Sequence, residues 1–386
     1  MFLYKVVFAV IVGTLAACGS TPLQSPPGVP PPAPAAPSAP PSVPAADISL
    51  PDDTGPLPAP LTQGKSRWTP VRWSALPGLG QDTFSEAWAA WLRSCERPAA
   101  VIGTLCPEVR RLTLASPAEQ LAWMARRLQP YRVEPLEGST EGLLTSYYEP
   151  VLTASRTPRP GFNVPLYKAP ATLNSRRPWY SRQEMDTLPD ARAALQGREI
   201  AYLADPIDAL ILQVQGSGRM RMLETDGSQR LVRLAFAGSN EQPYKSVGRW
   251  LIDQGAVKDA SWAAIKAWAA QNPQRLNDML YSNPRVIFFR EEPVDGDVGP
   301  KGAQGVPLTA GRSIAVDRAS IPYGAPVWLA STGPGAQLQR LVMAQDTGSA
   351  IVGAVRADYY AGSGDAAGEF ANRIKQPLQL WVLWPK

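Results

Sequence analysis

The sequence predicts a mainly β protein with accessory helices (α+β), in which one region of mixed structure is inserted into a β-rich unit. Helical patterns come first, and alternating apolar residues with Gly and Pro punctuation follow from Gly142 to Ala237, a pattern that predicts strands and hairpins. After a helical stretch from Lys245 to Leu280, short apolar strands return in RVIFFR, RSIAVD, PVWLA, RLVMAQD and LQLWVLW. With 386 residues, the chain is long enough for two or three domains.

The first residues predict a secretion signal. Lys5 precedes an apolar run from Val6 to Leu15, which is too short to predict a membrane-spanning helix. The LAAC ending resembles a bacterial lipoprotein signal, in which residues 1–17 are the signal peptide and Cys18 carries lipid. This resemblance implies an anchor in the outer membrane, facing the periplasm of a Gram-negative bacterium. The alternative is a plain signal peptide with an incidental cysteine.

A tether follows the signal. From Thr21 to about Leu61 the chain consists mostly of Pro, Ala, Ser and Val, which form no helix and lack a core-forming pattern. We therefore predict that residues 18–65 hold the lipidated cysteine and a semi-rigid spacer of polyproline character, rather than a proline motif that binds a partner.

The globular part begins near Ser66, and its helices carry tryptophans that predict a core. The segment Phe84–Cys95 places Trp88 and Trp91 on one helical face, and such stripes are more often core than sugar-stacking platforms. Ser116 is expected to cap a second helix through a capping box. A third helix is predicted from Ser261 to Asn272.

The cysteines and the composition exclude several chemistries. The chain has no histidine, so Ser-His-Asp and Cys-His nucleophile systems are excluded, and three cysteines are too few for a four-thiolate zinc site. We expect no metal and no cofactor, so Asp, Glu, Lys, Tyr, Ser and backbone groups would carry any catalysis. If Cys18 is lipidated, Cys95 and Cys106 form a structural disulfide or remain buried free thiols. The net charge of +5 is a weak argument for nucleic acid, which we do not expect as a partner.

Three aspartates in the C-terminal part lie near predicted strand ends. Asp317 follows SIAV, Asp346 follows LVMAQ and Asp358 follows AVRA, and each has turn residues soon after it. A rigid β scaffold presents functional groups at such positions. The neighbouring glycines allow close approach of the backbone, so an extended polymer could lie against this surface.

Seven motifs in order resemble the membrane-bound lytic transglycosylase A (MltA) family. They are SYYEPVL, ILQVQGSGRM, AFAGSNEQPYKSVGRWLIDQG, LYSNPRVIFF, AVDRASIPYG, AQDTGSAIVG and ADYYAGSGD, and they extend from about Gly142 to Trp384. Any one of them is weak, but their order and spacing together identify the chain as a member.

The resemblance implies a double-psi β-barrel domain with a smaller β-rich domain inserted into it, and a substrate groove between them. We expect the barrel in residues 66–148 plus 288–386, and the glycan-binding insert in residues 149–287. The implied activity is that of a peptidoglycan lytic exotransglycosylase, a carbon–oxygen lyase that cleaves the β-1,4 bond between N-acetylmuramic acid and N-acetylglucosamine and leaves a 1,6-anhydro end. Glycan strands, the membrane through Cys18, and cell-wall remodelling proteins are the partners expected.

The same resemblance assigns candidate site residues. The family's catalytic aspartate falls on Asp358, with Asp346 as its neighbour. The substrate-binding candidates are Gln215, Gly216, Ser217, Gly218, Tyr147, Tyr148, Glu149, Asp317 and Tyr359. Among the aromatic residues, Tyr148, Tyr359 and Tyr360 are candidates for a sugar platform. Val352 departs from a lysine common in the family, which we expect to alter surface charge rather than chemistry.

The chemistry agrees with a single acid. Glycosidic cleavage passes through an oxocarbenium-like transition state, and the bridging oxygen must be protonated as it leaves. A carboxyl with a pKa of about 4 is mostly ionised at neutral pH. Asp358 must therefore be desolvated, or lie near a negative group such as Asp346, to hold a proton. As a carboxylate it can then accept a proton from the sugar's own C6 hydroxyl, which attacks C1 in place of water.

Other interpretations of these residues remain open. Asp317 could cap the turn that follows it, Asp346 could organise a buried turn, and QGSG could form a tight hairpin turn. Glu149 could offer a second carboxylate in the groove. A non-catalytic peptidoglycan-binding lipoprotein would keep the groove without needing Asp358. The DTGS string at Asp346 resembles aspartic peptidases, but those enzymes need two such aspartates.

Overall fold

The computed structural model describes residues 54–137 and 141–386, so the predicted signal peptide, Cys18 and most of the tether lie outside the described residues. The strands of the described part form two sheets, one of nine strands and one of six. This arrangement confirms the mainly β class with accessory helices. Within these residues, no helix is both long and apolar enough to span a membrane.

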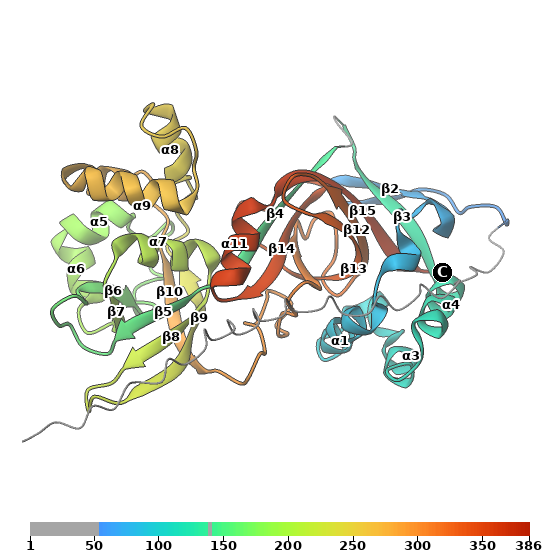
Figure 1. Ribbon diagram of the computed structural model, residues 1–386, viewed down its shortest axis with the longest axis horizontal. Helices are drawn as coiled ribbons and strands as arrows, with labels where there is room; N and C mark the ends of the chain where they lie inside the picture. Colours follow the sequence, from blue (N-terminus) through green and yellow to red (C-terminus); the bar gives the residue numbers. More distant parts are fainter. Residues whose placement is uncertain (1–53, 138–140) are drawn as a thin grey trace, which may run out of the picture. The chain divides into compact units, whose positions relative to one another are not determined.

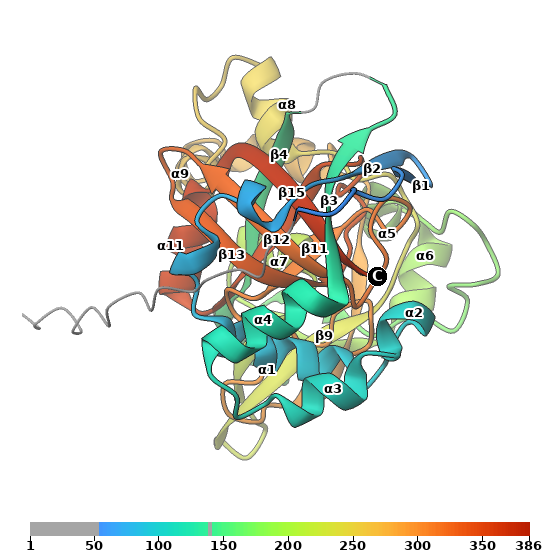
Figure 2. The same ribbon diagram turned by 90° about the vertical axis from the view of Figure 1, so that its right-hand side faces the viewer.

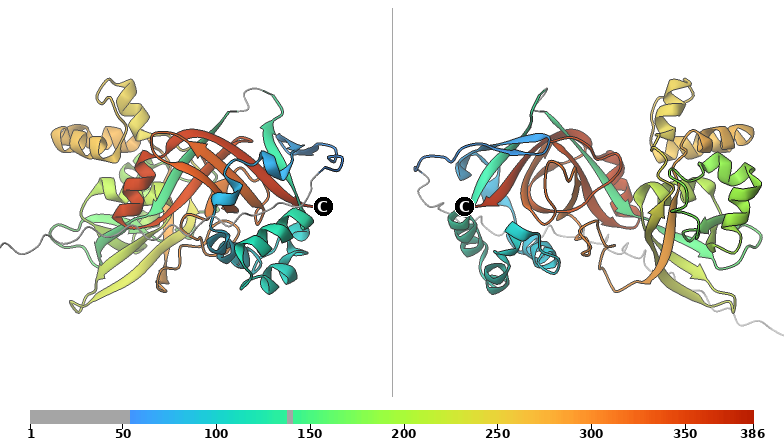
Figure 3. Two further views of the ribbon diagram at one scale, coloured as in Figure 1. Left: turned by 45° about the vertical axis from the view of Figure 1, so that its right-hand side comes forward. Right: turned by 180° about the vertical axis from the view of Figure 1, so that it is seen from behind.

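The nine-stranded sheet closes into a barrel over six of its strands. Its strands are β1 (Leu61–Gln63), β2 (Ser66–Pro70), β3 (Leu128–Pro135), β4 (Gly142–Glu149), β11 (Ser313–Val316), β12 (Pro326–Thr332), β13 (Gln337–Asp346), β14 (Arg356–Ser363) and β15 (Lys375–Pro385). Their order is β1-β2-β3-β15-β12-β13-β11-β14-β4, and an additional pairing of β4 with β15 closes the strands from β15 to β4 into a ring, with β1, β2 and β3 outside it. Figure 1 shows this ring, and the right-hand view of Figure 3 shows it from behind. The predicted barrel is therefore confirmed.

Apolar side chains fill the barrel and set the register of its strands. Ile314, Val327, Val342 and Val382 come from four different strands, and all are fully buried in one cluster. Because side chains alternate between the two faces of a strand, a slip by one residue would move this whole set out of the barrel interior. The register is therefore strongly specified, and it fixes where the polar residues of the same strands lie.

The six-stranded sheet is built from the chain between β4 and β11. Its strands are β5 (Val151–Ser155), β6 (Val164–Tyr167), β7 (Glu199–Leu203), β8 (Gly218–Leu223), β9 (Gln229–Ser239) and β10 (Ile287–Pro293), in the order β10-β9-β8-β5-β7-β6. This sheet continues to the end of β10, past the boundary expected at residue 287. The division into two domains stays a prediction.

The helices form two groups and one single element. Before β3 come α1 (Phe84–Ser94), α2 (Ala100–Gly103), α3 (Cys106–Arg111) and α4 (Pro117–Arg127). Within the inserted chain lie α5 (Arg182–Thr187), α6 (Pro189–Leu195), α7 (Pro206–Gln215), α8 (Val247–Asp253), α9 (Trp262–Gln271) and α10 (Leu276–Tyr281). The last helix, α11 (Asp365–Arg373), follows β14. Short 3-10 helices occupy Trp73–Ala75, Leu79–Gln81 and Pro273–Arg275.

The first helix group is held by a tryptophan cluster, as predicted. Trp88 lies 5.2 Å from Trp91 between ring centroids, and each lies 5.6 Å from Trp123. Figure 2 shows α1, α3 and α4 gathered together. Ser116 forms the predicted capping box at the start of α4. Cys95 and Cys106 are joined by a disulfide, which links the end of α1 to the start of α3.

Helix α7 contradicts the strand prediction for its segment. Asp205 caps it by accepting a hydrogen bond from the backbone N–H of Ile207 at 2.8 Å. The helix is apolar on two faces because it packs between two cores. Leu212 faces the core of the six-stranded sheet, whereas Leu210 and Ile211 face the core formed with α8, α9 and α10. A helix apolar on two faces loses the amphipathic pattern by which sequence analysis recognises helices.

Candidate active site

The two candidate aspartates lie in one row across neighbouring barrel strands. The register aligns Ala315 of β11 with Asp346 on one side and with Asp358 on the other, and it aligns Asp358 with Thr145 of β4. Adjacent strands lie about 4.8 Å apart, so the backbones of the two aspartates are about 10 Å apart. Asp358 lies inside β14, whereas the sequence placed it at a strand end or in a loop.

Strand β4 holds both carboxyl groups through alternate residues. Thr145 and Tyr147 are two positions apart, so their side chains project from the same face of the strand. The hydroxyl of Thr145 donates a hydrogen bond to Oδ1 of Asp358. The hydroxyl of Tyr147 donates to Oδ2 of Asp346 at 2.7 Å. One strand thus orients the two acids relative to each other.

Arg356 determines which oxygen of Asp358 is engaged. Its Nη2 donates a hydrogen bond to Oγ1 of Thr145 at 2.8 Å. Because the threonine oxygen accepts from a guanidinium, its own proton is directed to Oδ1 of Asp358. Oδ2 of Asp358 has no hydrogen-bond partner in the described part of the chain. That oxygen is therefore the one available to carry a proton toward a ligand.

Burial raises the pKa of both acids, but hydrogen bonds stabilise the two carboxylates to different extents. Burial raises the pKa of Asp358, the Thr145 hydrogen bond and the Arg356 charge lower it in part, and the charge of Asp346 raises it further. Burial also raises the pKa of Asp346, against hydrogen bonds from Tyr147 and from the backbone N–H of Ala303 at 2.9 Å. Asp346 accepts on both carboxylate oxygens and Asp358 on one, so Asp346 is the better-stabilised anion and Asp358 the better proton carrier.

The QGSG motif forms the end of α7 rather than a hairpin turn. Gly216 takes the left-handed conformation of a helix C-cap, with a φ of 89°. A Cβ at Gly218 would lie 2.5 Å from Cδ1 of Leu212, so a larger residue there would require the Leu212 side chain to move. Oε1 of Gln215 accepts from the backbone N–H of Tyr148 at 3.0 Å, which leaves the amide nitrogen of Gln215 for a ligand.

Two adjoining hollows bring these groups together. The larger, here called the cleft, has a volume of about 480 Å³ and is lined by Tyr147, Gln215, Gly216, Ser217 and Asp346 among others. The smaller, here called the recess, has a volume of about 170 Å³ and is lined by Tyr244, Asn283, Arg285, Arg356 and Asp358 among others. Six residues line both: Gln213, Val214, Arg285, Ile287, Gly348 and Ser349. Barrel residues and residues of the inserted chain therefore face the same space.

Glu149 is not a groove carboxylate. Its side chain is fully buried, and it pairs with Arg219 at 2.8 Å and with Arg233. The hydroxyl of Ser363 also donates to it at 2.7 Å. Because Arg219 and Arg233 belong to β8 and β9, this ion pair joins the end of β4 to the six-stranded sheet.

Three other candidates also lie outside the cleft. Tyr359 packs in the barrel core, and its hydroxyl donates to the backbone oxygen of Gly311 at 2.9 Å, so it offers no sugar platform. Both carboxylate oxygens of Asp317 accept backbone hydrogen bonds, from Ala319 at 3.0 Å and from Gly353 at 2.9 Å, which agrees with the turn-capping interpretation. Tyr148 packs against Gly368 of α11.

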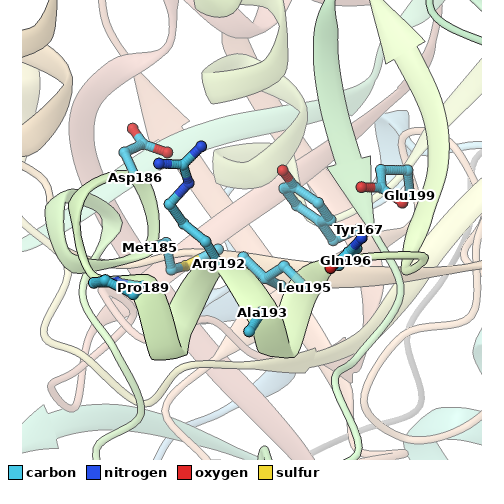
Figure 4. Close-up of a pocket in the computed structure, with 9 residues that line it drawn as sticks. All are labelled: Tyr167, Met185, Asp186, Pro189, Arg192, Ala193, Leu195, Gln196 and Glu199. Carbon is cyan, nitrogen blue, oxygen red and sulfur yellow. The ribbon is translucent and has the colours of Figure 1, made fainter.

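A larger hollow of about 750 Å³ lies between the α5–α6 segment and strands β6 and β7 (Figure 4). Figure 4 shows Asp186 and Arg192 at one end of it, and Tyr167 and Glu199 at the other. It contains none of the predicted site residues. We therefore place the candidate active site in the cleft and the recess.

Sequence reasoning missed the partners of the acids. Thr145 lies two residues before Tyr147, and Arg356 lies two residues before Asp358. Since alternate residues of a strand share a face, the period of two could have pointed to both. Arg285 lies far from the aspartates in the chain, so no local pattern indicated that it would line the recess.

Two protein-family models match this chain. The model described as "MltA specific insert domain" matches residues 143–290, and the model described as "3D domain" matches residues 312–384. A membrane-bound lytic murein transglycosylase A from Vibrio cholerae is 32% identical over 251 residues, which cover 62% of this chain and 65% of that relative, just under two thirds of its length.

Two solved structures extend the similarity. The lytic transglycosylase LtgG of Burkholderia pseudomallei is 40% identical, with 86% of this chain and 98% of that chain covered and a TM-score of 0.57. Escherichia coli MltA, solved with bound chitohexaose, is 26% identical, with 85% of this chain and 96% of that chain covered and a TM-score of 0.66. The motifs, the barrel with its inserted sheet, and these similarities together show that the chain belongs to the MltA family.

Proposed function

We propose that the protein is a lytic transglycosylase that cleaves the β-1,4 bond between N-acetylmuramic acid and N-acetylglucosamine in peptidoglycan, with Asp358 serving as acid and then as base. One observation carries the proposal: Asp358 lines the recess with one oxygen held by Thr145 and the other free, and burial raises its pKa. The Vibrio cholerae relative is named for this activity, and the Escherichia coli relative binds a β-1,4-linked glycan.

The reaction uses one proton, which leaves Asp358 and then returns to it. Protonated Asp358 gives its proton to the glycosidic oxygen as the bond to C1 breaks, and positive charge develops at C1. The Asp358 carboxylate then accepts the proton of the C6 hydroxyl while that oxygen bonds to C1. The products are a free 4-hydroxyl on N-acetylglucosamine and a 1,6-anhydro-N-acetylmuramyl end. No water is consumed, because the nucleophile belongs to the substrate.

The neighbours of Asp358 have separate roles. The charge of Asp346 opposes ionisation of Asp358 and attracts the positive charge that develops at C1. Tyr147 and the N–H of Ala303 keep Asp346 in place. The amide nitrogen of Gln215 and the hydroxyl of Ser217, both at the wall of the cleft, would bond N-acetyl and hydroxyl groups of the glycan.

The location and the remaining expectations belong to the same proposal. A lipid anchor at Cys18 would hold the enzyme at the outer membrane, which fits the membrane-bound relative. The tether would let the cleft reach the glycan strands. The attack from chain ends and the association with cell-wall remodelling proteins stay predictions.

The test is mass spectrometry of soluble products released from purified sacculi by the parent protein and by its Asp358→Asn variant. Products lighter than reducing muropeptides by one water, absent with the variant, would support the proposal. Asp365→Asn is the matched control, because Asp365 is exposed and lies seven residues further along the chain. It is expected to retain activity.

Three outcomes would count against the mechanism. Ordinary reducing ends would make water the nucleophile, and Asp346 would become the candidate for its base. Unchanged turnover by Asp358→Asn would remove Asp358 from the chemistry. Sacculus binding without any product from the folded parent would favour the non-catalytic wall-binding lipoprotein.

A further inference from the structure

The recess beside Asp358 contains two cationic side chains. Arg285 and Arg356 both line it, and neither forms an ion pair in the described part of the chain. Burial lowers the pKa of Arg285, against the charge of Glu241. A partly desolvated guanidinium without a counter-ion is unfavourable, and an anion bound beside it would relieve that cost.

The two arginines differ in how far their donors are used. Arg356 donates to Thr145 and to backbone oxygens of Leu143 and Ala357, so its guanidinium serves to position Asp358. Among the described residues, the Arg285 guanidinium makes one hydrogen bond, from Nη1 to the backbone oxygen of Gln242 at 3.0 Å. Its other N–H groups remain available to a ligand in the recess.

Arg285 is also held in place by the residues around it. Nη2 of Arg182 donates to the backbone oxygen of Arg285 at 2.7 Å and to the side chain of Gln213 at 2.6 Å. The backbone N–H of Arg285 donates to Oδ1 of Asn283 at 3.2 Å. The segment that carries the guanidinium is therefore fixed before any ligand arrives, which lowers the entropic cost of binding.

The recess admits a substituent rather than a whole sugar. It holds about 170 Å³. At about 30 Å³ per water molecule, that volume accommodates about five or six non-hydrogen atoms. A carboxyl group on a short branch fits this volume. The forked donors of a guanidinium match a carboxylate, which they can bind through two parallel hydrogen bonds.

We propose that Arg285 binds a carboxylate carried by the glycan next to the scissile bond, so that the protein prefers acidic over neutral β-1,4-linked glycans. The inference rests on the proposed function, because the recess adjoins the candidate acid. Two sources share this chemistry in peptidoglycan: the lactyl carboxylate of peptide-free N-acetylmuramic acid and the carboxylates of stem peptides.

The test measures binding by calorimetry with the Asp358→Asn variant as parent, so that no ligand is cleaved. The three ligands are peptide-free glycan strands, the same strands with stem peptides, and chitohexaose, which has the same linkage and no carboxylate. Adding Arg285→Gln is expected to weaken binding of an acidic strand about ten- to a hundredfold and to leave chitohexaose binding within about twofold. Loss on the peptide-free strand assigns the lactyl group, and loss only on the peptide-bearing strand assigns the stem.

Two further variants make the result specific. Arg67→Gln, an exposed charge change on β2, is expected to affect no ligand. Arg285→Lys, which keeps the charge and loses the fork, is expected to recover part of the affinity. Equal weakening by Arg285→Gln of the binding of all three ligands, or no weakening of the binding of either acidic strand, would overturn this inference. The proposed function would not be affected by that result. Binding of none of the ligands by the folded parent would overturn the proposed function together with it.

Discussion

Replacing Glu149 by glutamine tests the buried ion pair that joins the two sheets. Its fully buried carboxylate accepts from Nε of Arg219 at 2.8 Å, from Ser363 at 2.7 Å and from two nitrogens of Arg233. The Arg233 side chain is only 5% exposed. Glu149→Gln keeps the shape but leaves one buried and one partly buried cation without a counter-ion. Breaking such a pair from one side costs about 3–5 kcal/mol, a large share of the roughly 5–15 kcal/mol that stabilises a typical domain.

Urea denaturation followed by tryptophan fluorescence measures this loss through the free energy of unfolding extrapolated to water. The matched control is Asp253→Asn, which removes an ion pair between side chains that are 51% and 74% exposed. An exposed pair contributes at most about 1 kcal/mol. If Glu149→Gln loses no more than this control, the reasoning that the ion pair joins the sheets is refuted.

Four further changes have expected outcomes. Thr145→Val removes a hydrogen bond that lowers the pKa of Asp358, so the basic limb of the pH–rate profile on sacculi should move to higher pH; an unmoved limb would contradict this role. Because burial raises the folded pKa of Asp358 above its unfolded value, stability falls as pH rises through the folded pKa. Asp358→Asn should therefore melt above the parent at pH 7, with the difference vanishing below about pH 4; a lower melting temperature at pH 7 would count against burial. Replacing Cys95 and Cys106 by serine opens a disulfide of sequence separation 11 and should cost about 3 kcal/mol in urea denaturation. Ser116→Ala should cost about 1 kcal/mol in the same assay, and no change would mean that the capping box is dispensable.

The sequence predicted the elements whose patterns are local. The amphipathic tryptophan helix and the capping box at Ser116 appear where the pattern placed them. So do the five apolar strands β10, β11, β12, β13 and β15. Helix α7 was missed because two cores bury it on two sides, so its apolar residues lost their period. Which segments pack on both sides of a helix is a property of the whole fold.

The site was predicted in part for the same reason. The motifs named Asp358, Asp346 and the QGSG segment, and all of these except Gly218 line the adjoining cleft and recess. They also named Glu149 and Tyr359, which face the interior. A motif records residue types in order, whereas burial depends on which face of a strand meets another element. Arg285 belongs to the LYSNPRVIFF motif, but the sequence assigned it no role because only folding brings it to the recess that Asp358 lines.

A barrel strand suits an acid catalyst in a chain without histidine better than a loop would. On a loop, water would solvate the carboxyl, its pKa would stay near about 4, and it would carry almost no proton at neutral pH. Inside β14, pairing with β11 on one side and β4 on the other fixes the backbone of Asp358, and Thr145 fixes one of its oxygens. The burial that raises its pKa also destabilises the folded carboxylate, so the apolar core of the barrel must offset that cost. Burial of Asp358 therefore both lowers the stability of the fold and allows this residue to donate a proton. A change at Asp358 that removes the cost in stability should also abolish proton donation.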